Sequence, residues 1–318
     1  MRTAPGRHGA LIIEPQGRPG VLVKTAHGAE AREQIEREAA AYRRLGADER
    51  LRRLAPRLLH HDPDTATLVL ELVPAGGNGD PPPALIRPSV AEWLGGALAD
   101  LHVATPLESS KPQPERAPWL VWLDVPPLAL ALRLEPSAAR LSRLVQQTPA
   151  LAQGLAAVRA RWTLSCACHM DVRPDNVVVP GDEAKGDPCL VDWENAGAGD
   201  PAWDLGWALG SFLSLWVRSM PADPSAPVRE LVARAKLPFN DTRVAAMALW
   251  QAYLERRPSP RPVTAHVTRC AAARLLGTAI EVIDAADGLT SEAALQAQLA
   301  ATMMERPEAA ARDLLGIR

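Results

Sequence analysis

The sequence predicts an α+β protein of two lobes: a small β-rich N-terminal lobe, residues 1–74, and a larger, mainly helical C-terminal lobe, residues 75–318. Short apolar runs separated by Gly and Pro gather in the first quarter of the chain. Long segments with helical periodicity fill most of the remainder. The two parts meet at a loose Gly- and Pro-rich stretch, residues 75–83, which is typical of a boundary between structural units.

The composition is that of a soluble globular protein with enough chain to build two cores. The 318 residues are 47% hydrophobic and 23% charged, with 30 Pro but only two Phe and two Tyr. We therefore expect core volume to come from Ala, Leu, Val and the nine Trp. A net charge of -2 without a concentrated basic stretch argues against a nucleic-acid partner.

Membrane and secretory signals are lacking in the sequence. The N-terminal residues contain no apolar run fit for a signal peptide, and the longest apolar helix candidate, residues 203–217, is short and interrupted by Asp204. The four cysteines are too few and too irregularly spaced for a disulfide framework. These observations predict a cytoplasmic protein with no membrane partner; they do not disclose its oligomeric state.

The segment Cys166-Ala167-Cys168-His169 has the residue types of half a zinc site. No second Cys/His pair follows at the spacing of a zinc finger or ribbon. The preferred interpretation is therefore a strand that leads into a functional loop.

The small lobe begins with two expected strands, residues 9–14 and 21–25, joined by a turn rich in Gly and Pro. A helix is expected over residues 31–45, with Ile35, Glu38, Ala39 and Tyr42 on one face. Burying a carboxylate is costly unless it is paired, and Lys24 is the only lysine of this lobe. We predict a Lys24–Glu38 pair; the alternative is that both are solvated surface charges.

The boundary region begins with a strongly apolar strand, residues 68–74. Beyond the linker, Ser89 is expected to cap a helix that ends at His102. A proline-interrupted insert, residues 106–127, then carries Trp119 and Trp122, and helices continue to about residue 160. Further helices are expected over residues 202–217, 241–256, 263–286, 291–304 and 307–317.

The most informative motif is His169-x-Asp171-x(4)-Asn176, followed after a hydrophobic strand by Asp192-Trp193-Glu194. This spacing is that of a site for phosphoryl transfer: Asp171 would accept the proton of an acceptor hydroxyl, while Asn176 and Asp192 would hold Mg2+. The alternative is a turn with ordinary caps between two buried strands.

Together with the segment from Gly199 to Leu205, these motifs resemble the aminoglycoside phosphotransferases and choline kinases, small-molecule relatives of the protein kinases. The resemblance implies a protein-kinase-like fold with an ATP cleft between the lobes. It also implies an ATP-dependent enzyme that phosphorylates a hydroxyl of a small molecule.

The resemblance assigns further residues. Lys24 would reach the ATP phosphates and be oriented by Glu38, and the backbone of Glu71 and Val73 would bind the adenine edge. Arg173, two residues after the expected base, would stabilise the transferring phosphate; the alternative is an exposed arginine bonded to a backbone carbonyl.

Two features depart from the family pattern. Only residues 1–4 precede the glycine loop at Gly6 and Gly9, so the first strand is expected to be short or missing. Either the start of this sequence lies too far downstream, or the glycine loop binds phosphate weakly. Met170 stands where many of these kinases have glycine, and its side chain would narrow the acceptor side of the loop.

The expected acceptor is a hydroxylated amine, such as an aminoglycoside-like antibiotic, a basic peptide antibiotic or an amino alcohol. Glu194 lies just past the metal ligand, and Trp119 and Trp122 offer aromatic faces for a cation. A nucleotide-binding pseudokinase that acts as an interaction protein is the alternative. Retention of Asp171, Asn176 and Asp192 together argues against it. A metal-dependent hydrolase would need further His or Asp ligands.

Overall fold

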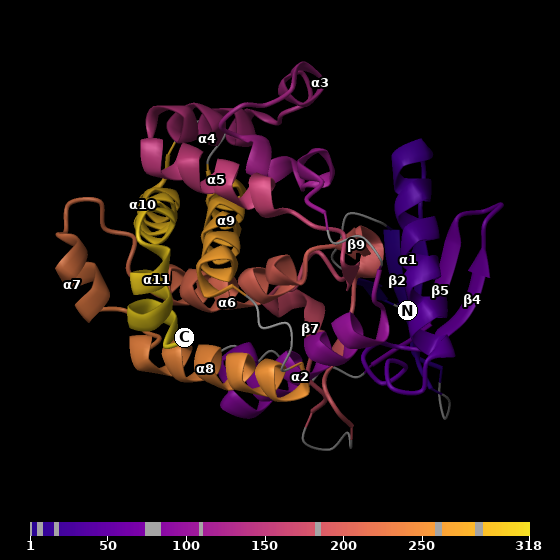
Figure 1. The fold of residues 1–318 in the computed structure, drawn as a ribbon. Coiled ribbons are helices and arrows are strands. Elements are labelled where there is room, and N and C mark those ends of the chain that lie inside the picture. Colours follow the sequence, from indigo (N-terminus) through magenta and orange to yellow (C-terminus); the bar gives the residue numbers. More distant parts are fainter. Residues whose placement is uncertain are drawn as a thin grey trace.

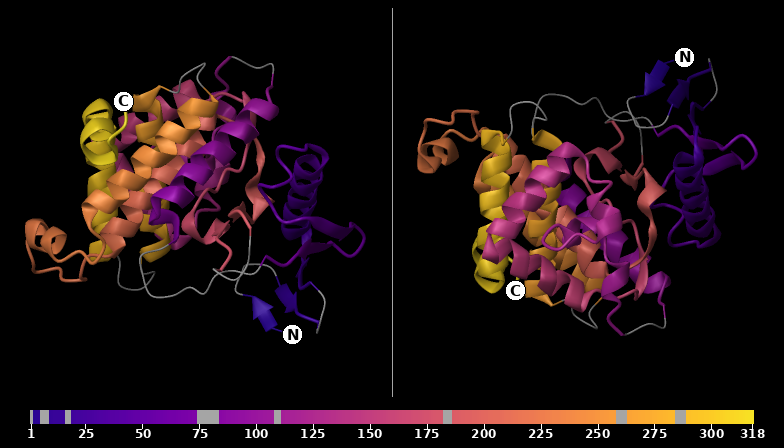
Figure 2. Two further views of the ribbon diagram at one scale, coloured as in Figure 1. Left: turned by 90° about the horizontal axis from the view of Figure 1, so that it is seen from below. Right: turned by 90° about the horizontal axis from the view of Figure 1, so that it is seen from above.

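The computed structural model describes residues 2–4, 9–15, 19–73, 84–107, 111–181, 186–257, 263–283 and 289–318. A sheet and one long helix form the N-terminal part, and helices make up most of the rest (Figure 1). Two further views show the same division from below and from above (Figure 2). The predicted α+β class and two-lobed arrangement are confirmed. The expected lobe boundary at residue 74 lies outside the described residues.

The sheet of the small lobe has five strands in the order β1-β2-β3-β5-β4, and every pair of neighbours is antiparallel. A strand does precede the glycine loop, but it is only three residues long. The loop itself, including Gly6, lies outside the described residues. The strands are β1 (Arg2–Ala4), β2 (Gly9–Ile13), β3 (Val21–Thr25), β4 (Leu58–Asp62) and β5 (Thr67–Glu71).

Helix α1 (Ala29–Ala47) follows β3 and stands beside the sheet (Figure 1). It buries Ile35, Ala39 and Tyr42, as the helical periodicity predicts, and it buries Glu38 with them. The predicted apolar face is thus correct, and the helix extends two residues beyond the predicted range at each end.

The large lobe is built around the helix pair α6 (Pro201–Arg218) and α9 (Thr264–Val282), with α2 (Pro88–Ala104) packed on α8 (Phe239–Arg256). The expectation that Ser89 caps α2 is wrong: the helix begins at Pro88, whose fixed φ suits the first turn, and Arg87 precedes it without a side-chain cap. The other helices are α3 (Leu128–Ala131), α4 (Pro136–Gln147), α5 (Pro149–Arg161), α7 (Val228–Ala233), α10 (Ser291–Glu305) and α11 (Pro307–Ala310).

Two short ladders hold the loops that carry the predicted motif. Strand β6 (Cys166–Cys168) pairs with β9 (Gly197–Gly199), and β7 (Val177–Val178) pairs with β8 (Cys189–Leu190). The chain from β6 to β7 contains Asp171, and the chain from β8 to β9 contains Asp192. Because both ladders join these segments, the two loops lie side by side. Within the described part of the chain, no helix has the length and apolarity needed to cross a bilayer.

The close approach of α2 and α8 depends on a glycine. A Cβ on Gly95 would lie 2.1 Å from the backbone oxygen of Leu249, whereas a Cβ on Gly46 of α1 would meet nothing within 4 Å. We expect Gly95→Ala to lower the free energy of unfolding by about 2 kcal/mol or more, because backbone must move. Gly46→Ala should raise it by about 0.5–1 kcal/mol through helix propensity. Urea denaturation measures both, and a stable Gly95→Ala protein would contradict the packing.

Candidate active site

Asp171 lies in the loop between β6 and the 3-10 turn η4 (Pro174–Asn176), and both of its carboxylate oxygens accept hydrogen bonds. The Nδ2 amide of Asn176 donates to Asp171 Oδ2 at 3.2 Å and to its backbone oxygen at 2.9 Å. The indole Nε1 of Trp207 donates to Asp171 Oδ1 at 3.0 Å. Two side-chain donors, from Asn176 and Trp207, therefore fix the orientation of the Asp171 carboxylate.

The buried carboxylate of Asp204 on α6 anchors the loop that contains Asp171. Asp204 accepts the backbone N–H groups of His169 and Met170, each at 2.8 Å, and also lies 3.2 Å from His102 Nε2. The other nitrogen of His102 is 3.0 Å from the hydroxyl of Tyr253. His102 therefore packs beneath the loop, and Asp204 braces the loop through its backbone N–H groups. Helix α6 itself begins after the N-cap Asp200, whose carboxylate accepts the N–H of Ala202.

Backbone conformation explains the bracing. Met170 adopts φ 71, in the left-handed region that a residue with a side chain rarely enters. Its N–H donates to Asp204, and its carbonyl accepts from Trp203 Nε1 at 3.1 Å. These bonds hold a conformation that costs about 1–3 kcal/mol at a residue other than glycine. His169 also orients the loop: its Nε2 faces the carbonyl of Val191 at 3.0 Å, and its Nδ1 accepts the N–H of Asp171.

Lys24, Glu38 and Asp192 form an ion cluster between the lobes. Lys24 Nζ lies 2.8 and 3.0 Å from the two oxygens of Glu38 and 2.7 Å from Asp192 Oδ1. The predicted Lys24–Glu38 pair is confirmed, and both side chains are buried rather than solvated.

Electrostatics keep the ammonium group charged. Burial acts to lower the pKa of Lys24, but the charges of Glu38 and Asp192 outweigh it and raise that pKa above its ordinary 10.5. Burial raises the pKa of Glu38 above its usual value against the opposing charge of Lys24. A raised lysine pKa stabilises the fold below about pH 10.5 and ceases to do so only at higher pH, so Lys24 is protonated at neutral pH.

The two predicted metal ligands are brought together by backbone contacts. The carbonyl of Asn176 accepts the N–H of Val191 at 2.9 Å, and Asp192 follows directly, in a left-handed conformation with φ 65. Because Nδ2 of Asn176 points to Asp171, its Oδ1 is the atom left to face an ion. Asp192 contacts Lys24 through Oδ1, so its Oδ2 is the oxygen that would bind an ion, and 37% of its side chain is exposed. An amide oxygen and a carboxylate oxygen are donors that suit Mg2+.

Arg173 is engaged with neighbouring carboxylates. Its guanidinium donates to Asp175 Oδ2 at 2.7 Å and to Glu281 Oε1 at 3.2 Å, and Arg274 donates to the same oxygen of Glu281 at 3.1 Å. Its expected role toward phosphate stays a prediction.

Glu194 is a buried residue of the turn that follows Asp192. It lies in the turn η5 (Trp193–Asn195), is only 7% exposed, and its carbonyl accepts from Arg37 of α1 at 3.0 Å. Of the insert's tryptophans, Trp119 is 48% exposed, whereas Trp122 has the guanidinium of Arg159 over its ring at 4.8 Å. The aromatic face predicted for a cation is therefore already covered at Trp122.

Trp207 is the site residue that the sequence interpretation missed. It is buried, stacks on Trp203 at 4.4 Å, and aims its N–H at the expected base. The sequence did contain a signal for this contact, namely the spacing of Trp203 and Trp207. Residues four apart on a helix share one face, and this face also carries Asp204, which contacts the loop.

Removing the N–H of Trp207 while keeping an aromatic ring isolates this contact. We expect Trp207→Phe to lower kcat about tenfold, since a hydrogen bond to a charged group contributes about 1.5–3 kcal/mol, with little change in the KM for ATP. Trp216→Phe on the same helix is the control, because Trp216 rests against Phe239. Equal steady-state rates for the two variants would remove Trp207 from the site.

Comparison with known proteins supplies independent findings. A model of the phosphotransferase enzyme family matches residues 11–250. No curated protein sequence matches the chain.

Several solved structures share the fold. A choline/ethanolamine kinase family protein from Mesorhizobium loti is 19% identical, with a TM-score of 0.55 over 98% of this chain and 90% of that one. A microcompartment-associated aminopropanol kinase is 17% identical, with a TM-score of 0.54 over 99% and 93%. An aminoglycoside phosphotransferase from Alicyclobacillus acidocaldarius is 15% identical, with a TM-score of 0.51 over 99% and 92%. At these identities the likeness concerns the fold.

Proposed function

Because the chain belongs to the phosphotransferase enzyme family, we propose that it transfers the γ-phosphate of ATP to a hydroxyl of a small molecule, with Mg2+ as the required ion. The observation that carries this proposal is the contact between the lobes. Lys24 of the sheet lies 2.7 Å from Asp192 beside the catalytic loop, while Glu38 holds its other side. Stability alone does not require a lysine buried between two carboxylates, because apolar residues in place of buried ions are often as stabilising or more so.

Each residue then has a role in the reaction. Asp171 would accept the proton of the attacking hydroxyl, and Trp207 and Asn176 would orient its carboxylate. Asn176 Oδ1 and Asp192 would hold Mg2+, which neutralises charge on the ATP phosphates. Most of the rate enhancement would come from positioning and electrostatics.

The nucleotide would lie between Lys24 and the strand β5. The N–H of Glu71 already donates to the carbonyl of Arg57 at 2.9 Å, and that of Leu72 donates to Gly20 at 3.0 Å. The adenine edge would therefore contact the carbonyl of Glu71 and the N–H of Val73. Arg173 would donate to the transferring phosphate after releasing Glu281.

The acceptor would approach Asp171 from the side of Trp207 and the insert. A Cβ on Gly277 of α9 would lie 3.6 Å from Trp207 and 3.7 Å from Leu120, so the turn η3 (Trp119–Trp122) borders this side. Because similar structures are described as choline/ethanolamine, aminopropanol and aminoglycoside kinases, hydroxylated amines are the first acceptors to test. Glu194 stays the predicted receiver of the amine, and it is only 7% exposed.

Nucleotide binding and turnover test the proposal in sequence. Thermal unfolding with ATP at a hundred times its Kd should show stabilisation of about 2.7 kcal/mol, and the effect should grow with Mg2+. ADP release should then be measured against amino alcohols, aminoglycosides and matched neutral alcohols. Binding without turnover on any acceptor would support a pseudokinase, and absence of binding would refute both functions.

A further inference from the structure

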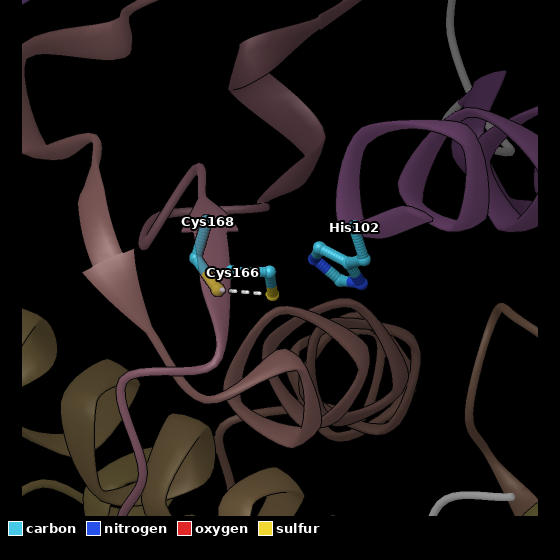
Figure 3. Close-up of side chains that lie close together, drawn as sticks. All are labelled: His102, Cys166 and Cys168. Carbon is cyan, nitrogen blue, oxygen red and sulfur yellow. Dashed lines mark hydrogen bonds between the residues drawn. The ribbon is translucent and has the colours of Figure 1, made fainter. Parts of the chain in front are cut away.

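Behind the catalytic loop, two cysteines of β6 and one histidine of α2 form a buried cluster. Figure 3 shows Cys166, Cys168 and His102 directed toward one another from these two elements. One potential ligand atom from each lies within 4.8 Å of the others, and all three residues are buried. His169, the sequence neighbour of Cys168, is not a member, because its Nε2 faces the carbonyl of Val191.

The two thiols already have the separation that a shared ion would impose. Residues two apart on a strand point to the same face, and the Sγ atoms lie 3.8 Å apart. Two thiolates bound to one zinc ion at about 2.3 Å and a tetrahedral angle are separated by about 3.8 Å. Little movement of β6 is therefore required for both to bind one ion.

We propose that Cys166, Cys168 and His102 form a binding site for a soft metal ion of the zinc type, separate from the Mg2+ ligands. Two thiolates and one imidazole are donors that zinc prefers over magnesium. Among the residues that the structure describes, no further His, Cys, Asp or Glu joins this cluster. The remaining coordination position would be taken by water or a small anion.

Occupancy of this site would act on the catalytic loop. Both ring nitrogens of His102 are engaged, with Tyr253 and with Asp204. A metal takes the lone pair of one nitrogen, so binding must break or rearrange one of these bonds. Asp204 is the residue that holds the N–H groups of His169 and Met170 beside Asp171. We therefore expect the ion to inhibit transfer, a consequence that rests on the proposed function.

A cavity beside α1 borders the cluster at Cys168. A cavity of about 200 Å³ lies between α1 and the β6–β9 pair, and Cys168 and Leu101 contribute to its lining. Arg37 and Arg44 also line it. Their positive charge favours delivery of the metal as a neutral or anionic complex rather than as the free cation.

Metal titration tests the site without any need for activity. Zn2+ is titrated against the full chain in competition with a chromophoric chelator, using wild type, Cys166→Ala and Cys168→Ala. Cys189→Ala is the matched control, because Cys189 is also a buried free cysteine but lies outside the cluster. We expect one tight equivalent in wild type and the control, weakened at least about tenfold in each cluster variant. Equal binding by all four proteins would overturn the site.

A second measurement uses wild type alone, so it does not depend on how the variants fold. Cd2+ should produce a thiolate-to-metal charge-transfer band that saturates at one equivalent. Absence of the band would refute the site.

Inhibition is measured with buffered free Zn2+ at fixed Mg2+, each protein relative to its own metal-free rate. Wild type and Cys189→Ala should lose turnover at a Zn2+ concentration that spares Cys168→Ala. Equal inhibition of all three would place the effect at the Mg2+ site and overturn the coupling. If no protein turns over any acceptor while the metal band persists, the proposed function fails and the metal site stands.

Discussion

Asp171→Asn is expected to lower kcat for phosphate transfer by about three orders of magnitude and to leave the affinity for ATP nearly unchanged. The carboxylate acts on the acceptor oxygen, and both of its oxygens accept hydrogen bonds from Asn176 and Trp207. An amide at this position cannot accept the proton, and its NH2 group would face one of these two donors.

The control for this variant is Asp175→Asn. Asp175 lies in the same loop and pairs with Arg173, but its side chain is 72% exposed. It should retain most of the turnover, since an exposed ion pair contributes little. Steady-state kinetics and nucleotide titration of both variants give the comparison. Turnover of Asp171→Asn within a few-fold of wild type would refute its role.

Asp192→Asn is expected to lower kcat/KM at least about a hundredfold and to raise the Mg2+ concentration needed for half-maximal rate. The change weakens an ion ligand and removes the charge that contacts Lys24 at 2.7 Å. Lys24 would then depend on Glu38 alone for its orientation.

Asp187→Asn is the matched control for the metal prediction, because Asp187 is exposed just before the same strand, β8. The measurement is the initial rate over a range of Mg2+ at saturating ATP. An unchanged Mg2+ dependence in Asp192→Asn would show that the ion binds elsewhere.

The parts of the site that are local in sequence could be predicted. Asp171 and Asn176 lie on one tight loop, so their spacing alone determines that they meet. Asp192 follows a strand that pairs with the strand after Asn176, so a ladder brings it to the same place. Lys24 and Glu38 were predicted because a carboxylate on a buried helix face requires a partner, and the lobe contains one lysine.

Contacts that depend on packing could not be predicted in this way. Trp207 reaches Asp171 only because α6 passes beneath the loop, and His102 reaches Cys166 only because α2 packs beside β6. Strand β4 escaped the sequence interpretation because its residues Leu59 and His60 are exposed at the sheet edge and break the apolar pattern. The six-residue helix α7 is too short for a periodic signal.

The burial of Glu194 could not be predicted from its position in the sequence. Its place two residues after a metal ligand suggested contact with an amine. The turn η5 packs against α1, the Glu194 side chain is buried, and Arg37 of α1 donates to the Glu194 carbonyl, while contact with an amine stays a prediction. Asp192 has a left-handed conformation, and the neighbouring helix sets the direction of the side chains that follow it. The local sequence does not contain that information.

Phosphorus NMR during turnover tests most directly whether this site transfers phosphate to a hydroxyl. Wild-type protein is mixed with Mg2+, ATP and each member of the acceptor panel, and Asp171→Asn is run beside it. The expected result is a new phosphomonoester signal that grows as the γ-phosphate signal of ATP declines, in wild type and not in the variant. Bound ATP that stays intact with every acceptor, or equal monoester formation by Asp171→Asn, would contradict the proposed reaction.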